Sequence, residues 1–298
     1  MSGNVSEQRQ QQPIERVGVV GCGQMGAGIA EVCARAGVDV RVAESDLAAA
    51  ERGRARIEAS FAKAVKRGKL AEAEAEAAYG RIAFSADLHD LADRQLVIEA
   101  VAEQEEAKTG VLAALDRIVT DPDAILASNT SSIPIMRLGT ATTRPGQVIG
   151  IHFFNPVPVL PLVELVPSLL TSESTRERAE RFVTERLGKR AVPARDRAGF
   201  VVNALLIPYL LAAVRMAESG FAAPQDIDDG MVLGCAHPMG PLRLADLIGL
   251  DTVRAAAEAM YEEFKEPLYT PPALLLRMVE AGQLGRKSGR GFYEYATA

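Results

Sequence analysis

The sequence predicts an α/β domain with a mainly parallel sheet, followed by an all-α domain. Three observations predict this class. The 298 residues exceed what one ordinary hydrophobic core organises. Short apolar segments alternate with amphipathic helical patterns through roughly the first two thirds of the chain. From Gly199 onward only helical patterns remain, punctuated by Gly and Pro. Strands that alternate with helices form parallel sheets covered on both faces.

The expected elements follow from apolar runs and their turn residues. Strands are expected at 15–20, 38–44, 81–85, 95–101, 124–130, 147–154 and 162–166. Helices are expected at 24–36, at about 46–78 and 105–119, and at 172–187. A boundary near 196–199, in "RDRAGF", divides a first domain, 13–198, from a helical domain, 199–298. Residues 1–12 are expected to form a disordered polar tail.

Composition excludes several classes of function. A formal net charge of −6 argues against a nucleic-acid-binding surface. Three cysteines without paired or metal-type spacing predict neither a disulfide framework nor a metal site. The longest apolar run is shorter than the roughly 18 residues of a membrane span, and the N-terminal sequence does not resemble a signal peptide. We therefore expect a cytoplasmic protein in a reducing compartment.

The motif "GVVGCGQMGAGIA" predicts a dinucleotide-binding turn of the Rossmann type. Its glycines, Gly21, Gly23 and Gly26, follow a strand and open a helix that begins with Gln24 and Met25. Gly21 permits the tight turn, Gly23 lets a pyrophosphate approach the backbone, and Gly26 lets helix and strand pack closely. The helix N-terminus favours the phosphate anion. The turn therefore predicts a dinucleotide cofactor whose pyrophosphate it binds.

Glu44 indicates which dinucleotide binds. It ends the second predicted strand, where an acid hydrogen-bonds the adenosine ribose hydroxyls and repels a 2′-phosphate. The position favours NAD over NADP. Two observations leave an alternative open: a strand-end acid is often only solvated, and the nearby Arg41 weakens the argument against NADP.

His152 and Glu164 form the candidate catalytic pair. His152, one of only three histidines, lies at the end of the strand "QVIGIHFF", and Glu164 lies on the next strand after a Pro-rich reversal. Twelve residues with a turn between them can bring the two strands side by side. "ASNTSS" (127–132) places hydroxyl groups at the end of the preceding strand, at the edge where α/β sheets bind ligands. A base held by an acid, beside hydroxyl donors and a nicotinamide, suits alcohol oxidation. The alternative is a satisfied core histidine.

On these motifs the chain resembles the L-3-hydroxyacyl-CoA dehydrogenase family, in particular its short single-function members. The resemblance runs from about residue 14 to 295 and includes "LVIEAVAEQEEAK", "ASNTSSIPI", "GIHFFNPVPVLPLVELV", "DRAGFVVNALLIPYLLAAV", "HPMGPLRLADLIGLD" and "GRKSGRGFYEY". It implies an NAD-binding domain with an eight-stranded sheet and a helical C-terminal domain that forms a homodimer. The implied reaction oxidises (S)-3-hydroxyacyl-CoA, in particular 3-hydroxybutyryl-CoA, to 3-ketoacyl-CoA.

The resemblance also implies roles for particular residues. His152 is the general base and Glu164 orients it, while Ser131 and Asn203 hold the substrate's 3-oxygen. The implied cofactor-side residues are Glu103, Lys108, Ser131 and Lys287. A Ser and a Lys of relatives bind CoA in the region "SFAKAVKRGKL" (60–70), which points to Ser60 and one of Lys66, Arg67 or Lys69. For each of these residues the alternative is a solvated helix end.

Two other functions remain open at this point. One is a dehydrogenase of a small free hydroxy acid, of the L-gulonate type, with the same Ser, His, Glu and Asn. The other is a non-catalytic, crystallin-like protein that keeps the fold. Turnover of CoA thioesters compared with free acids separates the three.

Overall fold

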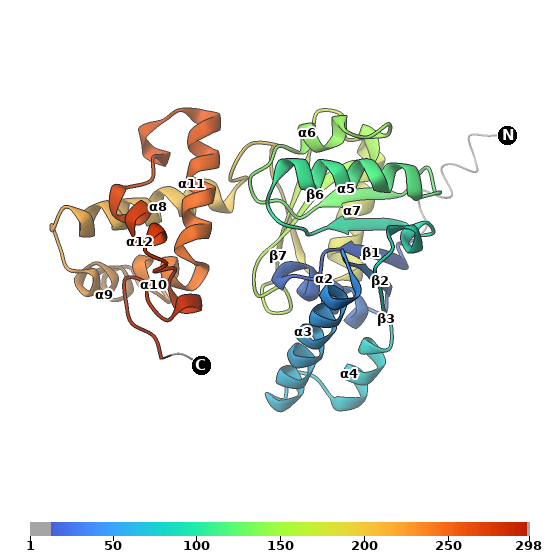
Figure 1. Cartoon of the computed structure of the whole chain (residues 1–298), viewed down its shortest axis with the longest axis horizontal. Helices are drawn as coiled ribbons and strands as arrows, with labels where there is room; N and C mark the ends of the chain where they lie inside the picture. Colours follow the sequence, from blue (N-terminus) through green and yellow to red (C-terminus); the bar gives the residue numbers. More distant parts are fainter. Residues whose placement is uncertain (1–12, 297–298) are drawn as a thin grey trace. The chain divides into compact units, whose positions relative to one another are not determined.

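The computed structural model describes residues 13–296 (Figure 1). The predicted tail, residues 1–12, lies outside the described residues. The chain divides into two compact units between Asp196 and Arg197. The first unit is α/β and the second is helical, so the predicted fold class is confirmed.

An eight-stranded sheet forms the centre of the first unit, in the order β3-β2-β1-β4-β5-β6-β7-β8. The strands are β1 (Arg16–Val20), β2 (Asp39–Ala43), β3 (Ile82–Ser85), β4 (Leu96–Glu99), β5 (Ile125–Ser128), β6 (Val148–Phe153), β7 (Leu162–Pro167) and β8 (Arg190–Pro193). Neighbours pair in parallel except β6 and β7, which are antiparallel. The seven strands predicted from the sequence are present. β8 was not predicted, because this four-residue edge strand has no fully buried residue and its sequence therefore lacks an apolar run.

The strand order reverses between β1 and β4. The chain builds outward from β1 to β3 and then returns to place β4 on the other side of β1. In doubly wound sheets this switch point leaves a crevice outside the carboxyl ends of the strands, where dinucleotides bind. The fold therefore places the ligand-binding edge at the ends of β1, β4, β5 and β6.

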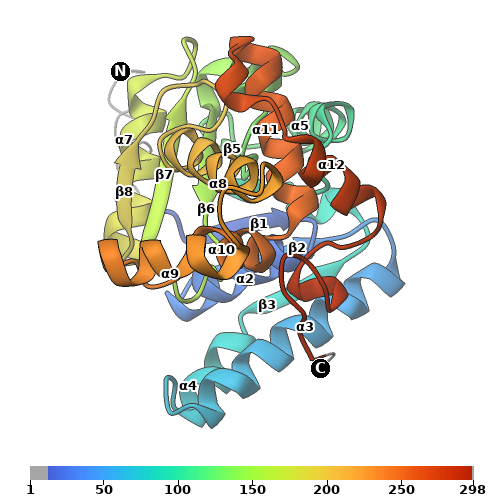
Figure 2. The same cartoon turned by 90° about the vertical axis from the view of Figure 1, so that its left-hand side faces the viewer.

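Helices cover both faces of the sheet (Figures 1 and 2). One face packs against α2 (Gln24–Arg35) and against α7 (Glu173–Arg181) with the π-helical segment η3 (Phe182–Arg186), through Val17, Val19, Ile98 and Ile151 among others. α5 (Glu105–Ile118) and α6 (Ile135–Thr140) pack on strands β4, β5 and β6. Every residue of the central strands β4, β5 and β6 is buried, because helices on both sides exclude water from this part of the sheet.

The predicted single helix over 46–78 is wrong: the segment forms two helices, α3 (Leu47–Lys66) and α4 (Glu72–Tyr79). They lie side by side and extend away from the sheet (Figures 1 and 2). Gly68 between them has a φ of 63°, a left-handed conformation that ends an α-helix and that glycine adopts without strain. The helical periodicity continues across this turn, so the apolar pattern alone did not reveal it.

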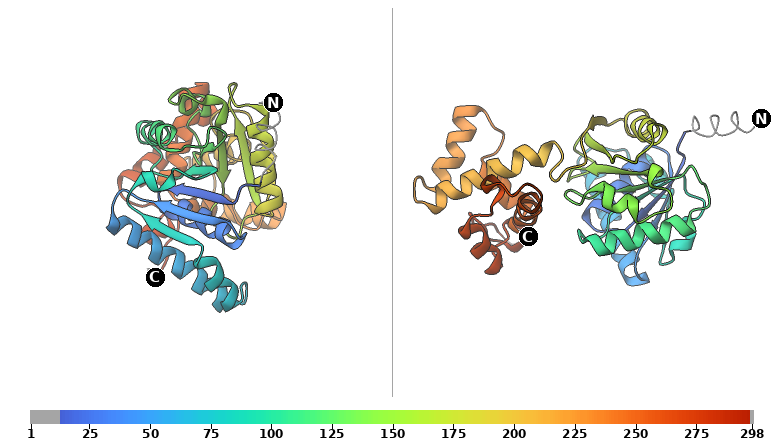
Figure 3. Two further views of the ribbon diagram at one scale, coloured as in Figure 1. Left: turned by 90° about the vertical axis from the view of Figure 1, so that its right-hand side faces the viewer. Right: turned by 90° about the horizontal axis from the view of Figure 1, so that it is seen from above.

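The second unit consists of helices around a core of its own (Figure 3). The helices are α8 (Val202–Glu218), α9 (Pro224–Cys235), α10 (Pro241–Ile248), α11 (Leu250–Phe264) and α12 (Ala273–Glu280). Leu210, Leu242 and Val253 are among its fully buried residues. Asp246 on α10 is also buried, and it holds the C-terminal segment by accepting the Phe292 amide at 3.0 Å.

Short 3₁₀ segments complete the described chain: η1 (Leu88–Leu91), η2 (Pro145–Gln147), η4 (Pro267–Tyr269) and η5 (Arg286–Ser288). Between residues 13 and 296, no helix is both long and apolar enough to cross a membrane. The same range contains no cluster of three His, Cys, Asp or Glu side chains with the geometry of a metal site.

Candidate active site

The glycine-rich turn joins β1 to α2 at the switch point of the sheet. Gly21 has a φ of 88°, and a Cβ on Gly26 would lie 1.8 Å from the Gly21 carbonyl oxygen, so strand and helix pack without a side chain between them. A Cβ built on Gly23 would meet nothing within 4 Å. This open space lies at the N-terminus of α2, whose first turn begins with Gln24 and Met25. The turn fits a pyrophosphate, since unpaired helix amides bind anions.

Glu44 follows β2 and reaches the glycine-rich turn. Its Oε1 accepts a hydrogen bond from the Cys22 amide, and its Oε2 accepts one from the Ser45 amide at 3.3 Å. The carboxylate is thus fixed beside the turn. The Arg41 guanidinium is held elsewhere, donating to the Asp90 carbonyl at 2.6 Å and lying 3.7 Å from Asp93. Arg41 is thus bound to Asp90 and Asp93 rather than to Glu44.

His152 and Glu164 lie directly opposite each other in the antiparallel pair of β6 and β7. The His152 Nδ1 is 2.7 Å from the Glu164 Oε2, and both residues are buried, with exposures of 6% and 0%. With Nδ1–H donating to the carboxylate, Nε2 of the neutral imidazole carries the lone pair. Such a ring accepts a proton at Nε2, while the carboxylate stabilises the resulting cation. The predicted side-by-side strands are confirmed.

The "ASNTSS" loop carries Ser131 from the end of β5 toward α6. Asn129 ties this loop to the next strand, because its Oδ1 accepts the Phe153 amide of β6 at 2.9 Å. The Ser131 amide and hydroxyl donate to Glu103 Oε1 at 2.8 and 3.3 Å. Ser131 therefore follows β5, and His152 lies near the end of the neighbouring strand β6, at the same edge of the sheet.

Glu103 and Lys108 belong to a network that sequence reasoning described only in part. Lys108 is 1% exposed, and its Nζ lies 2.8 Å from Glu99 Oε1 and 3.2 Å from Glu103 Oε2. Although burial would raise the pKa of Glu103, the Lys108 ammonium and hydrogen bonds from Thr130 and Ser131 hold it below its ordinary value. The sequence analysis missed Glu99. A charged residue ending the apolar strand "LVIE" was the available signal.

Asn203 and Lys287 lie in the second unit. Asn203 occupies the first turn of α8. Lys287 is in η5 and forms an ion pair with Asp251 of α11, with an Nζ–Oδ2 distance of 2.6 Å. The C-terminal segment that contains Lys287 is held to α10 by Asp246.

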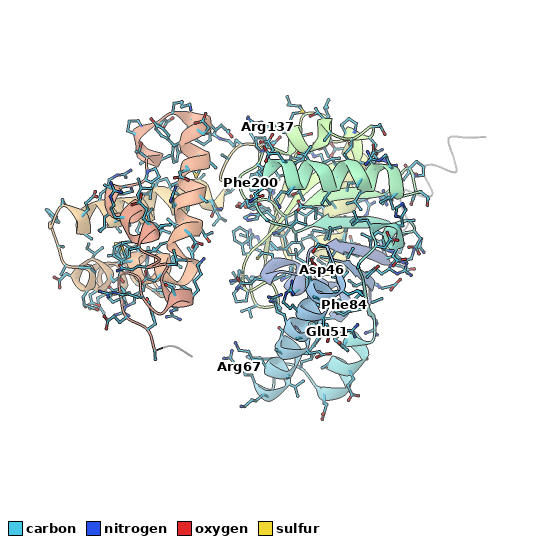
Figure 4. All side chains as sticks on the ribbon, viewed as in Figure 1. Asp46, Glu51, Arg67, Phe84, Arg137 and Phe200 are labelled. Carbon is cyan, nitrogen blue, oxygen red and sulfur yellow. The ribbon has the colours of Figure 1, made fainter. Side chains whose placement is uncertain are left out.

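The basic residues of "SFAKAVKRGKL" gather at the end of α3. Lys66, Arg67 and Lys69 are exposed, and Arg67 lies at the end of the helix remote from Asp46 (Figure 4). Within residues 13–296 these three side chains form no ion pair or hydrogen bond with other parts of the protein. Ser60 is half-buried and donates to the buried Glu31 at 2.5 Å.

Arg56 extends this basic surface toward the cofactor turn. It lies on the exposed face of α3, ten residues before Lys66, and its Nη1 donates to the Cys22 carbonyl at 2.6 Å. Helical periodicity places Arg56 on the same face as Arg67, since eleven residues are close to three turns. The contact of Arg56 with the cofactor turn was not predicted from the sequence, because Arg56 lies apart from the basic cluster at 66–69.

The sheet with its switch point, the glycine-rich turn and the acid after β2 define a dinucleotide-binding protein. The buried His–Glu pair at the same edge adds the groups of a dehydrogenase. Comparisons with known proteins agree. The NAD-binding domain of 3-hydroxyacyl-CoA dehydrogenase matches residues 16–197, and the C-terminal domain of 3-hydroxyacyl-CoA dehydrogenase matches residues 199–295.

Individual relatives cover nearly the whole chain. A 3-hydroxybutyryl-CoA dehydrogenase of Mycobacterium tuberculosis is 62% identical over 282 residues, which are 95% of this chain and 99% of the relative. The human mitochondrial hydroxyacyl-coenzyme A dehydrogenase is 39% identical over 292 residues, 95% and 91% of the two chains. The crystal structure of (S)-3-hydroxybutyryl-CoA dehydrogenase from Ralstonia eutropha has a TM-score of 0.90 at 45% identity, covering 95% and 100%.

The chain belongs to the 3-hydroxyacyl-CoA dehydrogenase family. It is an oxidoreductase, and NAD is its cofactor.

Proposed function

We propose that the protein interconverts (S)-3-hydroxybutyryl-CoA and acetoacetyl-CoA, with His152 as general acid and base oriented by Glu164. The observation that carries the proposal is the buried 2.7 Å contact between His152 Nδ1 and Glu164 Oε2. The names of the bacterial relatives support the four-carbon substrate. When bound, NAD accepts or supplies the hydride.

In the oxidation direction, His152 Nε2 removes the proton of the substrate hydroxyl. Glu164 keeps the Nδ1 proton in place and stabilises the imidazolium that forms, because a buried carboxylate 2.7 Å away acts with little screening. In the reverse direction the same imidazolium returns the proton to the 3-oxygen. Ser131 and Asn203 are proposed to donate hydrogen bonds to that oxygen, which fixes the carbon that exchanges hydride.

The cofactor-side residues are proposed to divide between the two halves of NAD. The turn at Gly21, Gly23 and Gly26 receives the pyrophosphate, and Glu44 binds the adenosine ribose. Glu103, Lys108, Ser131 and Lys287 are proposed to serve the nicotinamide half. Because three acceptors already surround Lys108 Nζ, we propose that Lys108 acts through Glu103 rather than by direct contact.

The end of α3 is proposed to bind the phosphates of coenzyme A. Lys66, Arg67 and Lys69 are exposed and provide cations for a 3′-phosphate and a pyrophosphate, which an acidic protein needs locally. Ser60 can donate to a phosphate oxygen only if its hydroxyl leaves Glu31.

We further propose a cytoplasmic homodimer formed through the second unit. Leu205, Phe221 and Leu233 in this unit expose 75%, 78% and 82% of their surface, and apolar side chains of that size are typical of subunit interfaces. Light scattering after gel filtration should give twice the chain mass, and a monomer would contradict the proposal.

The proposed reaction is tested by following NADH absorbance with acetoacetyl-CoA, longer 3-ketoacyl-CoAs and free acetoacetate under identical conditions. Acetoacetyl-CoA should give the highest kcat/KM. Free acetoacetate turned over as efficiently as its thioester would favour a dehydrogenase of small hydroxy acids. No turnover of any of these compounds would favour a non-catalytic protein.

A further inference from the structure

Glu99 is a buried carboxylate at the centre of the sheet that the proposed reaction does not use. It ends β4, is 0% exposed, and pairs in register with Ser128 at the end of β5. Its Oε2 accepts the Ser128 hydroxyl at 2.6 Å. Its Oε1 accepts the Val101 amide at 2.6 Å and the Lys108 ammonium at 2.8 Å. All three partners are donors, which is the environment of an ionised carboxylate.

Lys108 links the buried Glu99 to Glu103, which is partly exposed. An ammonium has three protons, and Lys108 Nζ has three acceptors: Glu99 Oε1, the Val101 carbonyl at 3.3 Å and Glu103 Oε2 at 3.2 Å. No proton is left for a further partner unless one of these contacts is lost. Because Glu99 ends β4 and Val101 follows it by two residues, Lys108 ties Oε2 of the partly exposed Glu103 to the end of that strand.

The group lies on the nicotinamide side of the switch point. Glu44 after β2 marks the side of the sheet that takes adenosine, so the other half of the dinucleotide lies over the ends of β4, β5 and β6. Glu103 follows β4 and binds Ser131 of the loop after β5. Two carboxylates and one ammonium leave this group with one net negative charge.

We propose that Glu99 is a positioning residue that, through Lys108, fixes Glu103 beside the nicotinamide and gives the group its net negative charge, which favours the cationic ring of NAD⁺ over the neutral ring of NADH. This inference rests on the proposed cofactor-side role of Glu103. A residue that only stabilises the fold would change the affinity for both cofactor forms equally. A charge effect instead changes the ratio of the two dissociation constants.

The test measures Kd for NAD⁺ and for NADH with the full-length protein, by calorimetry and by NADH fluorescence. Glu99→Gln and Glu103→Gln both make the group neutral, so each should raise Kd(NAD⁺)/Kd(NADH) by about threefold or more. Asp116→Asn is the matched control. Like Glu99→Gln, this substitution removes a buried negative charge. Asp116 lies on α5, binds Arg144 at 2.7 Å and is not part of the Glu99–Lys108–Glu103 group, so the ratio should stay unchanged.

The outcomes separate the inference from the proposed function. If Glu103→Gln changes the ratio and Glu99→Gln does not, Glu99 is only structural and the inference fails. If neither variant changes it, Glu103 does not face the nicotinamide and its proposed cofactor role fails as well. An equal effect in Asp116→Asn would also overturn the inference.

A second variant guards against misfolding of Glu99→Gln, since breaking a buried ion pair leaves one charge unpaired. Glu99→Gln/Lys108→Met removes both charges of the pair and retains the negative charge of Glu103. The ratio should then stay within about twofold of wild type. The affinity for both cofactor forms should fall, because Glu103 keeps its hydrogen bonds from Thr130 and Ser131 but loses the Lys108 contact at Oε2. A ratio raised as far as in Glu103→Gln would contradict the inference.

Discussion

The His152–Glu164 contact depends on the register of two strands rather than on any local motif. In an antiparallel pair, side chains directly opposite each other lie on the same face of the sheet, so the pairing of β6 with β7 brings imidazole and carboxylate together. A shift of β7 by one residue would turn Glu164 to the other face of the sheet, away from His152. The buried valine and leucine residues around Glu164 oppose such a shift.

Glu164→Gln tests the carboxylate. The substitution keeps the shape of the side chain but removes the charge that favours imidazolium, so kcat should fall. The measurement is kcat for 3-hydroxybutyryl-CoA oxidation. An unchanged rate would reduce Glu164 to a structural role.

Glu44 should make the enzyme prefer NADH over NADPH. Its carboxylate is fixed at the glycine-rich turn by the Cys22 amide, and a 2′-phosphate placed there would meet its charge. We expect a preference of about tenfold or more, equivalent to at least about 1.4 kcal/mol. The measurement is kcat/KM with both cofactors.

Arg41→Ala is the control for Glu44. The Arg41 guanidinium is bound to the η1 segment at the Asp90 carbonyl, so its removal should leave cofactor preference unchanged. Equal use of both cofactors by the wild-type protein would contradict the role of Glu44. A preference that changes in Arg41→Ala would show that this arginine does reach the cofactor.

At the scale of elements, α3 combines two functions of the site. Its N-terminal half contacts the cofactor turn through Arg56, and its C-terminal end presents the basic cluster proposed to bind coenzyme A. The apolar residues Ile57 and Phe61 bury the opposite face of the helix against the first unit. Because the buried face sets the rotation of the helix, it also determines which cations are exposed.

Replacing Lys66, Arg67 and Lys69 together by Ala should raise KM for acetoacetyl-CoA several-fold and leave kcat nearly unchanged. The effect should shrink as salt rises, since exposed charges are screened over about 10 Å at 0.1 M salt. The control replaces three exposed arginines elsewhere in the first unit by Ala: Arg117, Arg176 and Arg190. It therefore makes the same change in net charge. If both triple variants raise KM equally, the effect is one of net charge and the cluster is not a site.

Asp116 fastens α5 to the segment before β6. Its carboxylate accepts the Thr143 amide and the Arg144 Nε, each at 2.7 Å. Burial would raise the pKa of Asp116, but these two partners hold it below its ordinary value. A depressed folded-state pKa means that the stabilisation is present above the unfolded pKa and is lost as pH falls through the folded one.

Asp116→Asn should therefore lower the free energy of unfolding by about 2 kcal/mol at pH 7, the scale of a hydrogen bond to a charged group. The deficit should begin to shrink below about pH 4, the unfolded-state pKa of an aspartate, and should be lost as pH falls through the lower folded-state pKa of Asp116. Urea unfolding of the wild-type and Asp116→Asn proteins, at pH 7 and below about pH 4, measures this difference in the free energy of unfolding. A deficit that is constant with pH would show that the carboxylate charge contributes nothing.

Apolar patterns in the sequence predicted most, but not all, of the secondary-structure elements of the first unit. The seven strands it predicted are present because each is a short apolar run between turn residues. The division of residues 46–78 into two helices was not predicted. The helix ends before Gly68, but the helical spacing of apolar residues continues past it. The edge strand β8 has no fully buried residue, so its sequence carries little hydrophobic signal.

For the whole molecule, sequence order and parallel pairing were sufficient to place the candidate site at the carboxyl edge of the sheet. The His–Glu pair could be foreseen because two polar residues interrupt neighbouring apolar strands. The network around Glu99 could not be read in the same way, since it depends on which donors the fold brings to a buried carboxylate. The role of Arg56 likewise depends on the orientation of α3 against the cofactor turn.

The most direct test of the account is the kcat of His152→Gln for NADH-dependent reduction of acetoacetyl-CoA, measured together with its Kd for NADH. The substitution removes the only proposed proton-transferring group, so kcat should fall by roughly 10² to 10⁴, the usual contribution of a positioned general acid or base. The Kd for NADH should remain within about twofold of wild type, because the glycine-rich turn and Glu44 are untouched. A His152→Gln protein that binds NADH normally and keeps a kcat within a few-fold of wild type would contradict the account.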